Sequence, residues 1–144
     1  MATIPPERRE LLDAGIAEVA EREAAMSAVD FLGAEALRIE AAHAMARFHQ
    51  RFDLLLTAAT PTAAFAADQP TIRPREALWR DWAPWTAAFN LTRQPAISVP
   101  VGLDAEGMPR AVQVAAALHR DDLALRGARA IELAAAVRPL PNAA

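Results

Sequence analysis

The stretch from Asn90 to Gln113 constrains the fold more than any other part of the chain. After a helical beginning it contains a short apolar run, Ala96 to Val99, which ends at Pro100. A turn follows with Glu106-Gly107 at its tip, and a second apolar run covers Ala111 to Ala116. Short apolar runs bounded by Pro and Gly are typical of buried strands. The loop between them has the length of a hairpin loop, which predicts that the two strands pair antiparallel.

A third strand is predicted over residues 53–57. Leu54, Leu55 and Leu56 form a continuous apolar run between Asp53 and the turn at Thr60-Pro61. A run without polar alternation is typical of a strand whose two faces are both buried. We therefore expect this strand to lie in the interior of a sheet.

Four helices are predicted around these strands, over about residues 6–25, 29–51, 85–92 and 121–137. Pro5 and Pro6 suit a first helical turn, and Ser27 followed by Asp30 suits a capping box that starts the second helix. The second helix places its larger apolar residues along one stripe, which indicates a face that another element covers: Leu32, Ala36, Leu37, Met45, Phe48 and Phe52.

These elements predict an α/β protein with a few-stranded mixed sheet and flanking helices. The 144 residues fit a single domain, 1–144. Three strands are few for a free-standing sheet, and the two long helices need a surface to cover.

The composition excludes several classes of function. A net charge of −3 gives no basic field for nucleic acid or an anionic membrane. No apolar run reaches the length that spans a bilayer, and the first residues have no apolar segment of a signal peptide. A cytoplasmic protein is therefore expected. The three His lack the spacing of metal ligands, and no metal or other cofactor is predicted.

The inventory of reactive side chains is also narrow. All 15 basic residues are Arg, the chain has no Lys and no Cys, and its only serines are Ser27 and Ser98. Arg stays protonated in proteins and cannot replace Lys as a base. Ser27 is best explained as a helix cap, and Ser98 lies within a predicted strand and outside any nucleophile elbow.

Four blocks in fixed order give a family resemblance. They resemble the C-terminal portion of the amidase signature family of C–N hydrolases, and together they extend over nearly the whole chain. The matching residues are Pro6, Arg9 and Gly15; Ser27 to Leu32 with Arg38; Phe52, Asp53, Leu55, Leu56, Thr57 and Pro61; and Asn90, Thr92, Pro95, Ala96, Ser98, Val99, Pro100, Gly102, Gly107, Pro109 and Gln113. The chain departs from the family at Arg93 and Ala111, where Gly is usual, and at Ala58, where Pro is usual.

The resemblance implies a function and also a gap. The family hydrolyses carboxamides to a carboxylic acid and ammonia or an amine, with two Ser and a Lys from a Gly/Ser-rich segment and an upstream strand. Neither segment is in this sequence, so no catalytic residue is carried over. The chain is expected to be inactive alone and to form part of the wall around the substrate.

The substrate-pocket candidates are Trp82, Trp85, Phe89 and Thr92. Tryptophans recur every three residues here, and helical spacing would gather them into an aromatic wall for an apolar substrate. The competing interpretation is a satellite cluster packed on the edge of the sheet.

The expected partners are the missing N-terminal amidase portion, or further copies of the chain that associate through exposed apolar surface. A small amide would be the substrate of the complete enzyme. The alternative is a non-catalytic small-molecule binding or interaction module, which would be a monomer with a closed surface.

Overall fold

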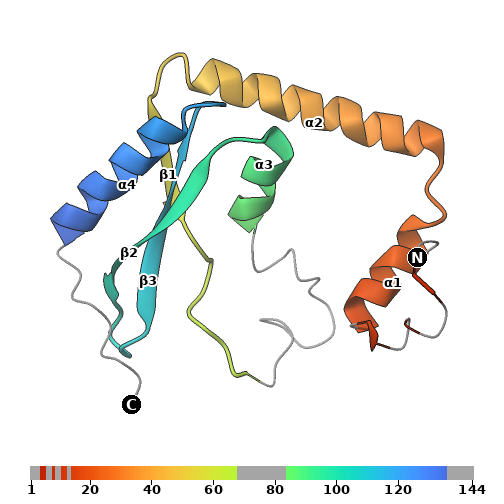
Figure 1. Ribbon diagram of the computed structural model, residues 1–144, viewed down its shortest axis with the longest axis horizontal. Helices are drawn as coiled ribbons and strands as arrows, with labels where there is room; N and C mark the ends of the chain where they lie inside the picture. The colour runs from red at the N-terminus through yellow and green to blue at the C-terminus, as the bar shows by residue number, and fades with distance from the viewer. Residues whose placement is uncertain (1–3, 6–7, 9–10, 13, 68–83, 136–144) are drawn as a thin grey trace. The chain divides into compact units, whose positions relative to one another are not determined.

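A computed structural model of the chain describes residues 4–5, 8, 11–12, 14–67 and 84–135. Its helices and strands follow the order α1, α2, β1, α3, β2, β3, α4 (Figure 1). The contacts divide the chain into two compact units, Met1–Leu37 and Arg38–Ala144. Among the helices of the described ranges, none combines the length and apolarity that a bilayer crossing requires.

The first unit contains α1, Ala14–Glu23, and the beginning of α2, Ala28–Phe48. The predicted capping box is confirmed: the Asp30 backbone N–H donates to the Ser27 hydroxyl over 3.1 Å, and the Ser27 N–H donates to the Asp30 carboxylate over 3.2 Å. The hydroxyl of Ser27 also holds the pKa of Asp30 below its usual value. α1 begins later than predicted, and part of residues 6–13 lies outside the described residues.

The second unit is built on a three-stranded sheet. β1 is Leu54–Ala58, β2 is Ala96–Leu103 and β3 is Pro109–Ala116. The strand order is β1-β3-β2, so β3 is the central strand. β3 runs antiparallel to both neighbours, and the predicted hairpin of β2 and β3 is confirmed. The α/β class is as predicted, whereas the mixed sheet we expected is antiparallel throughout its described strands.

β2 continues past Pro100, where the sequence predicted its end. The Ala116 N–H donates to the Pro95 carbonyl over 3.1 Å, so the odd-numbered residues of this part of β2 face β3. Pro100 is even-numbered and faces the open edge, where a missing N–H breaks no bond to β3. The strand therefore continues to Leu103, with a register shift between Pro100 and Gly102.

The Asp104 carboxylate organises the hairpin turn. It accepts backbone N–H bonds from Met108 over 2.8 Å and from Glu106 over 3.0 Å, and Arg110 lies 2.7 Å from its second oxygen. These groups, with the Met108 N–H first, lower the pKa of Asp104. Gly107 has φ +80°, a conformation that Gly adopts at no steric cost.

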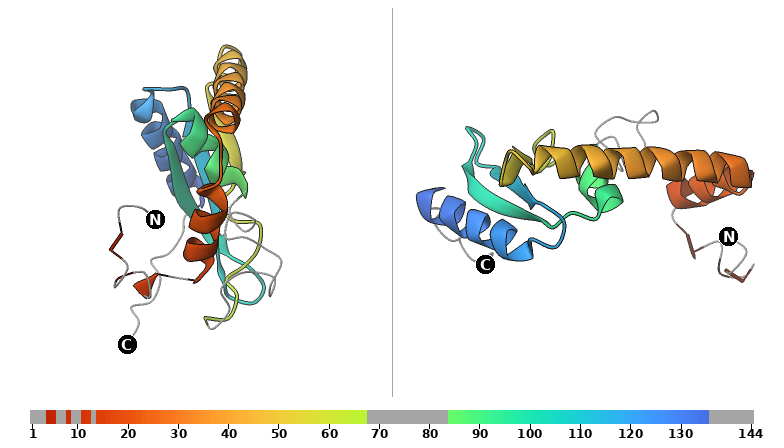
Figure 2. Two further views of the ribbon diagram at one scale, coloured as in Figure 1. Left: turned by 90° about the vertical axis from the view of Figure 1, so that its right-hand side faces the viewer. Right: turned by 90° about the horizontal axis from the view of Figure 1, so that it is seen from above.

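The core lies between the sheet and α4, Asp121–Ala135. α4 runs along one side of the sheet in Figures 1 and 2 and contacts all three strands. Its acidic first turn, Asp121 and Asp122, is placed favourably for the helix dipole. The buried centre consists of Val99, Val114 and Ala128, with Leu54, Ile97, Val112 and Ile131 packed around it.

α3, Pro84–Thr92, ends in a Schellman motif. The Gln94 N–H donates to the Phe89 carbonyl over 3.1 Å, and the Arg93 N–H donates to the Asn90 carbonyl over 3.3 Å. Arg93 has φ +60° at the position where Gly is usual in this motif. The departure from the family pattern at Arg93 therefore leaves the turn intact and places a side chain in the left-handed region.

We predict that Arg93→Gly stabilises the second unit by about 1 kcal/mol, because a non-Gly residue in the left-handed region costs about that much. Urea unfolding of both proteins measures the difference in the free energy of unfolding. Arg93→Ala is the matched control, since it removes the guanidinium and keeps the Cβ. An equal gain in Arg93→Ala would assign the effect to charge and contradict the backbone explanation.

Candidate functional site

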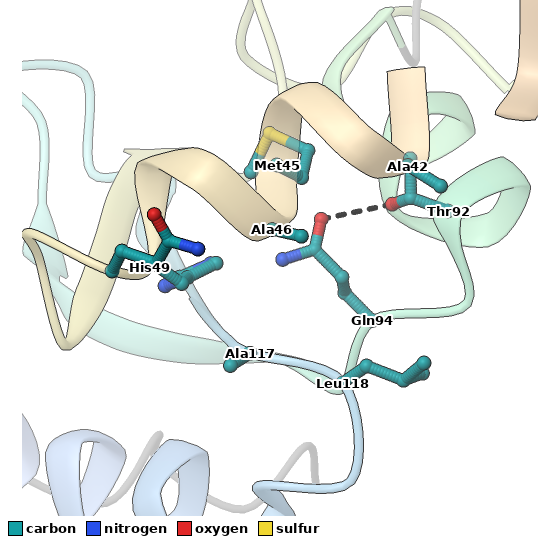
Figure 3. A pocket seen from close by; sticks show the side chains of 9 residues that line it. Ala42, Met45, Ala46, His49, Thr92, Gln94, Ala117 and Leu118 are labelled. Carbon is teal, nitrogen blue, oxygen red and sulfur yellow. Dashed lines mark hydrogen bonds between the residues drawn. The ribbon is translucent and has the colours of Figure 1, made fainter. Parts of the chain in front are cut away.

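An open hollow of about 260 Å³ lies between the C-terminal part of α2, the segment after α3 and the segment after β3. Figure 3 shows its lining side chains, and all of them belong to the second unit. We call it the His49 hollow. It is lined by Ala42, Met45, Ala46, His49, Gln50, Thr92, Gln94, Ala117 and Leu118.

One wall of the His49 hollow is held by hydrogen bonds around Gln94. Its amide Nε2 donates to the Ala116 carbonyl at the end of β3 over 3.0 Å. Its Oε1 lies 2.9 Å from the hydroxyl of Thr92, which is also 2.9 Å from the Ala88 carbonyl (Figure 3). A hydroxyl has one hydrogen, so Thr92 serves one of these acceptors at a time. Gln94 thus ties the end of α3 to the central strand.

His49 contributes the free acceptor of the His49 hollow. Its Nδ1 lies 3.0 Å from the Phe52 carbonyl oxygen, which can only accept, so Nδ1 carries the hydrogen in the neutral ring. Nε2 is then an acceptor, and it is buried without a hydrogen-bond partner. Within the described ranges, no three His, Asp or Glu side chains gather in a group that could hold a metal ion.

The four predicted pocket residues are placed differently. Trp82 lies outside the described residues. Trp85 is half-buried on α3, and Phe89 is buried. Thr92 is buried and is the only one of these four that lines the His49 hollow.

The sequence analysis did not find Met45, His49 and Gln94 as lining residues. Met45 and His49 are four residues apart and share a helix face. Their spacing could have indicated a common surface, but nothing in the sequence indicates that this surface meets Gln94.

A polar row crosses the sheet in register. Thr57 lies opposite Gln113, and Gln113 lies opposite Ser98. Gln113 is only 4% exposed, yet its Nε2 has no hydrogen-bond partner, and the buried Thr57 hydroxyl has none either. Ser98 is exposed, and its register neighbour is an amide, which is not a general base. The described strands therefore place Ser98 beside no group that could activate it.

The comparisons with known proteins agree on one family. The Amidase family model matches residues 2–125. The A-type subunit of the glutamyl-tRNA(Gln) amidotransferase of Parvibaculum lavamentivorans is 34% identical over 113 residues, which is 78% of this chain and 23% of that protein. The 6-aminohexanoate-cyclic-dimer hydrolase of Paenarthrobacter ureafaciens is 48% identical over 48 residues, which is 33% of this chain and 10% of that protein.

The fold agrees with the same family. The crystal structure of a 6-aminohexanoate cyclic dimer hydrolase matches 91% of this chain with a TM-score of 0.69 and 26% identity. The match covers 30% of the hydrolase. The chain thus spans less than a third of the solved structure it matches and about a quarter or less of these two curated relatives.

Proposed function

The chain belongs to the amidase signature family, and on that premise we propose that it is a C-terminal segment of an enzyme that hydrolyses carboxamides. The complete enzyme would convert an amide to a carboxylic acid and ammonia or an amine. The segment described by this sequence would supply part of the wall around the substrate. The nucleophile and the base would come from the remaining portion of the fold.

The surroundings of Ser98 carry this proposal. Of the two serines, Ser27 caps a helix and Ser98 lies in β2 opposite the amide of Gln113. The 144 residues contain no Lys, so the base that the family resemblance implies is not among them. A serine without an adjacent base is a weak nucleophile at neutral pH.

The family blocks have structural roles in this segment, which supports a supporting function. Ser27 starts α2, and the Arg38 guanidinium donates to the Leu91 carbonyl over 3.4 Å, close to the end of α3. Carbonyls in the last turn of a helix have no partner within the helix, and such a bond satisfies one of them. The second and last blocks are thus joined by a bond that holds α3 in place.

We propose α3 and the segment before it as the wall that the substrate would contact. Trp82, Trp85, Phe89 and Thr92 are the candidate residues, with the aromatic side chains offering apolar surface to a small amide. The burial of Phe89 and Thr92 gives this wall a rigid base. Trp85 is half-buried and has surface left for a ligand.

Exposed apolar side chains indicate that the segment works with a partner. α2 has no buried residue, although the sequence gives it an apolar stripe. The large apolar residues of the second unit that remain exposed are Ile39, Phe52, Leu56, Phe65, Leu91, Leu103, Leu118, Leu125 and Leu133. Such surface favours binding to the rest of an amidase fold, and self-association when that portion is absent.

We predict that the purified chain hydrolyses neither aryl nor aliphatic amides, because no described side chain activates Ser98. Release of ammonia or arylamine is measured at neutral pH, with an intact amidase signature enzyme as the positive control. Ser98→Ala separates the chain's own chemistry from a contaminating hydrolase. Turnover that disappears in Ser98→Ala would show a self-sufficient enzyme and overturn the proposal.

The His49 hollow favours a second candidate, a non-catalytic module that binds a small molecule. Its free Nε2 acceptor would take a hydrogen-bond donor from the ligand. This candidate requires a monomer with a closed surface. Size-exclusion chromatography with a dye that reports exposed apolar surface separates the two, because only the amidase segment is expected to bind the dye and self-associate.

A further inference from the structure

β1 has the sequence of an interior strand and the position of an edge strand. Its residues, Leu54–Ala58, include no charge and no Pro, and successive leucines point to opposite faces of the sheet. Such two-sided apolar strands are typical of sheet interiors. Yet β1 stands at the end of the order β1-β3-β2, and Leu56 is 55% exposed.

The backbone of β1 offers hydrogen-bonding groups at this edge. The Ala59 N–H donates to the Ala111 carbonyl over 3.1 Å, so alternate residues of β1 from Ala59 backward face β3. In an antiparallel ladder the intervening residues face the other way. The N–H and C=O groups of Leu54, Leu56 and Ala58 therefore point away from β3, where no strand of the described residues pairs with them.

The opposite edge of the sheet is protected. Pro100 faces outward there and has no N–H to donate, and β2 is irregular between Pro100 and Gly102. Proline and irregularity are the devices by which proteins block the addition of a strand. Of the two edges of this sheet, β1 alone has neither.

We propose that the outer edge of β1 pairs with a strand from the remaining portion of the amidase fold, which continues the sheet beyond β1. This inference rests on the proposed function and adds the surface through which the two portions join. The extent of the relatives argues for this occupant, since the matched hydrolase structure has about 70% of its length outside the region this chain covers. Addition of the strand would satisfy the outward groups of β1 and bury Leu56.

The test combines capture with amide exchange. The full chain is co-expressed with a tagged 6-aminohexanoate-cyclic-dimer hydrolase of Paenarthrobacter ureafaciens that lacks its C-terminal third. We expect the chain to be captured. By NMR, the amides of Leu54, Leu56 and Ala58 should exchange rapidly in the chain alone and slowly in the complex, while those of Ala96 and Ser98 in β2 stay unchanged.

Two proline variants form the matched pair. Leu56→Pro removes an outward N–H from β1, and Ser98→Pro removes an outward N–H from β2, so neither variant removes a bond to β3. Losing one interface hydrogen bond corresponds to about a tenfold loss of binding. Leu56→Pro should be captured about tenfold less than wild type, and Ser98→Pro as well as wild type. Slow exchange of the inward Thr57 amide reports an intact β1, and Leu56→Lys replaces a proline variant that fails this check.

Three outcomes would overturn the inference. They are no capture of the wild-type chain, protection of the β2 amides in place of the β1 amides, and protection of the β1 amides in the chain alone. If that last protection increased with concentration, a second copy would be the occupant. The proposed function fails on a different result, amide turnover by the chain alone that Ser98→Ala removes, so the two failures are distinguishable.

Discussion

Val114→Asp abolishes the cooperative unfolding transition of the second unit. Val114 is 0% exposed at the centre of β3, where it packs in the cluster of Val99 and Ala128. A carboxylate there would lose its hydration without gaining a charged partner from the cluster. The expected cost exceeds about 4 kcal/mol, which is close to the whole stability of many small domains.

Thermal unfolding followed by circular dichroism measures this effect. Leu133→Asp is the control, because it introduces the same charge on α4 at a side chain that is 63% exposed. A surface change of this kind should alter the free energy of unfolding by no more than about 0.5 kcal/mol. If Val114→Asp unfolded sharply near the wild-type temperature, the packing of α4 on the sheet would be incorrect.

Gly127→Leu destabilises the second unit by about 3 kcal/mol, because overpacking a filled core forces side chains and backbone apart. Gly127 lies on α4 where the helix meets the sheet. A Cβ added at this position would lie 2.5 Å from Leu54 Cδ1 and 3.3 Å from Val114 Cγ1. Leu54 can rotate away from a single methyl group, but an isobutyl group requires α4 to move.

Gly33→Leu is the matched control for this substitution. Gly33 is also helical, on α2, and an added Cβ would meet nothing within 4 Å. Leu is a better helix former than Gly by up to about 1 kcal/mol, so Gly33→Leu should leave stability unchanged or raise it. Urea unfolding of both variants measures the difference between them. Equal effects would mean that Gly127 has no packing role.

Much of the second unit could be predicted from the sequence. The apolar run of β1, the hairpin of β2 and β3, and the acidic start of α4 are local signals, and the structure has elements at these positions. The α/β class and the relation to the amidase signature fold also follow from residues at fixed spacing. These features depend on neighbours in the chain, which a sequence shows directly.

The remaining features depend on contacts that the sequence does not show. Pro100 lies within β2 because its missing N–H faces outward, which only the register of the pairing reveals. The apolar stripe of α2 predicts a covered face, but no residue of α2 is buried in this chain. The His49 hollow combines residues about 40 to 70 positions apart, such as Met45, Gln94 and Leu118. The roles of Trp85 and Phe89 in a substrate wall stay a prediction.

The central position of β3 sets an order of events during folding. Five residues separate β2 from β3, whereas positions 59–108 separate β1 from β3. Closing a loop ten times longer costs about 2 kcal/mol more in chain entropy. We therefore expect the hairpin to form early and β1 to join late, in a step whose rate is limited by topology. Until that step, the side of β3 that will receive β1 is itself open, so newly made chains would be most prone to aggregation at this stage.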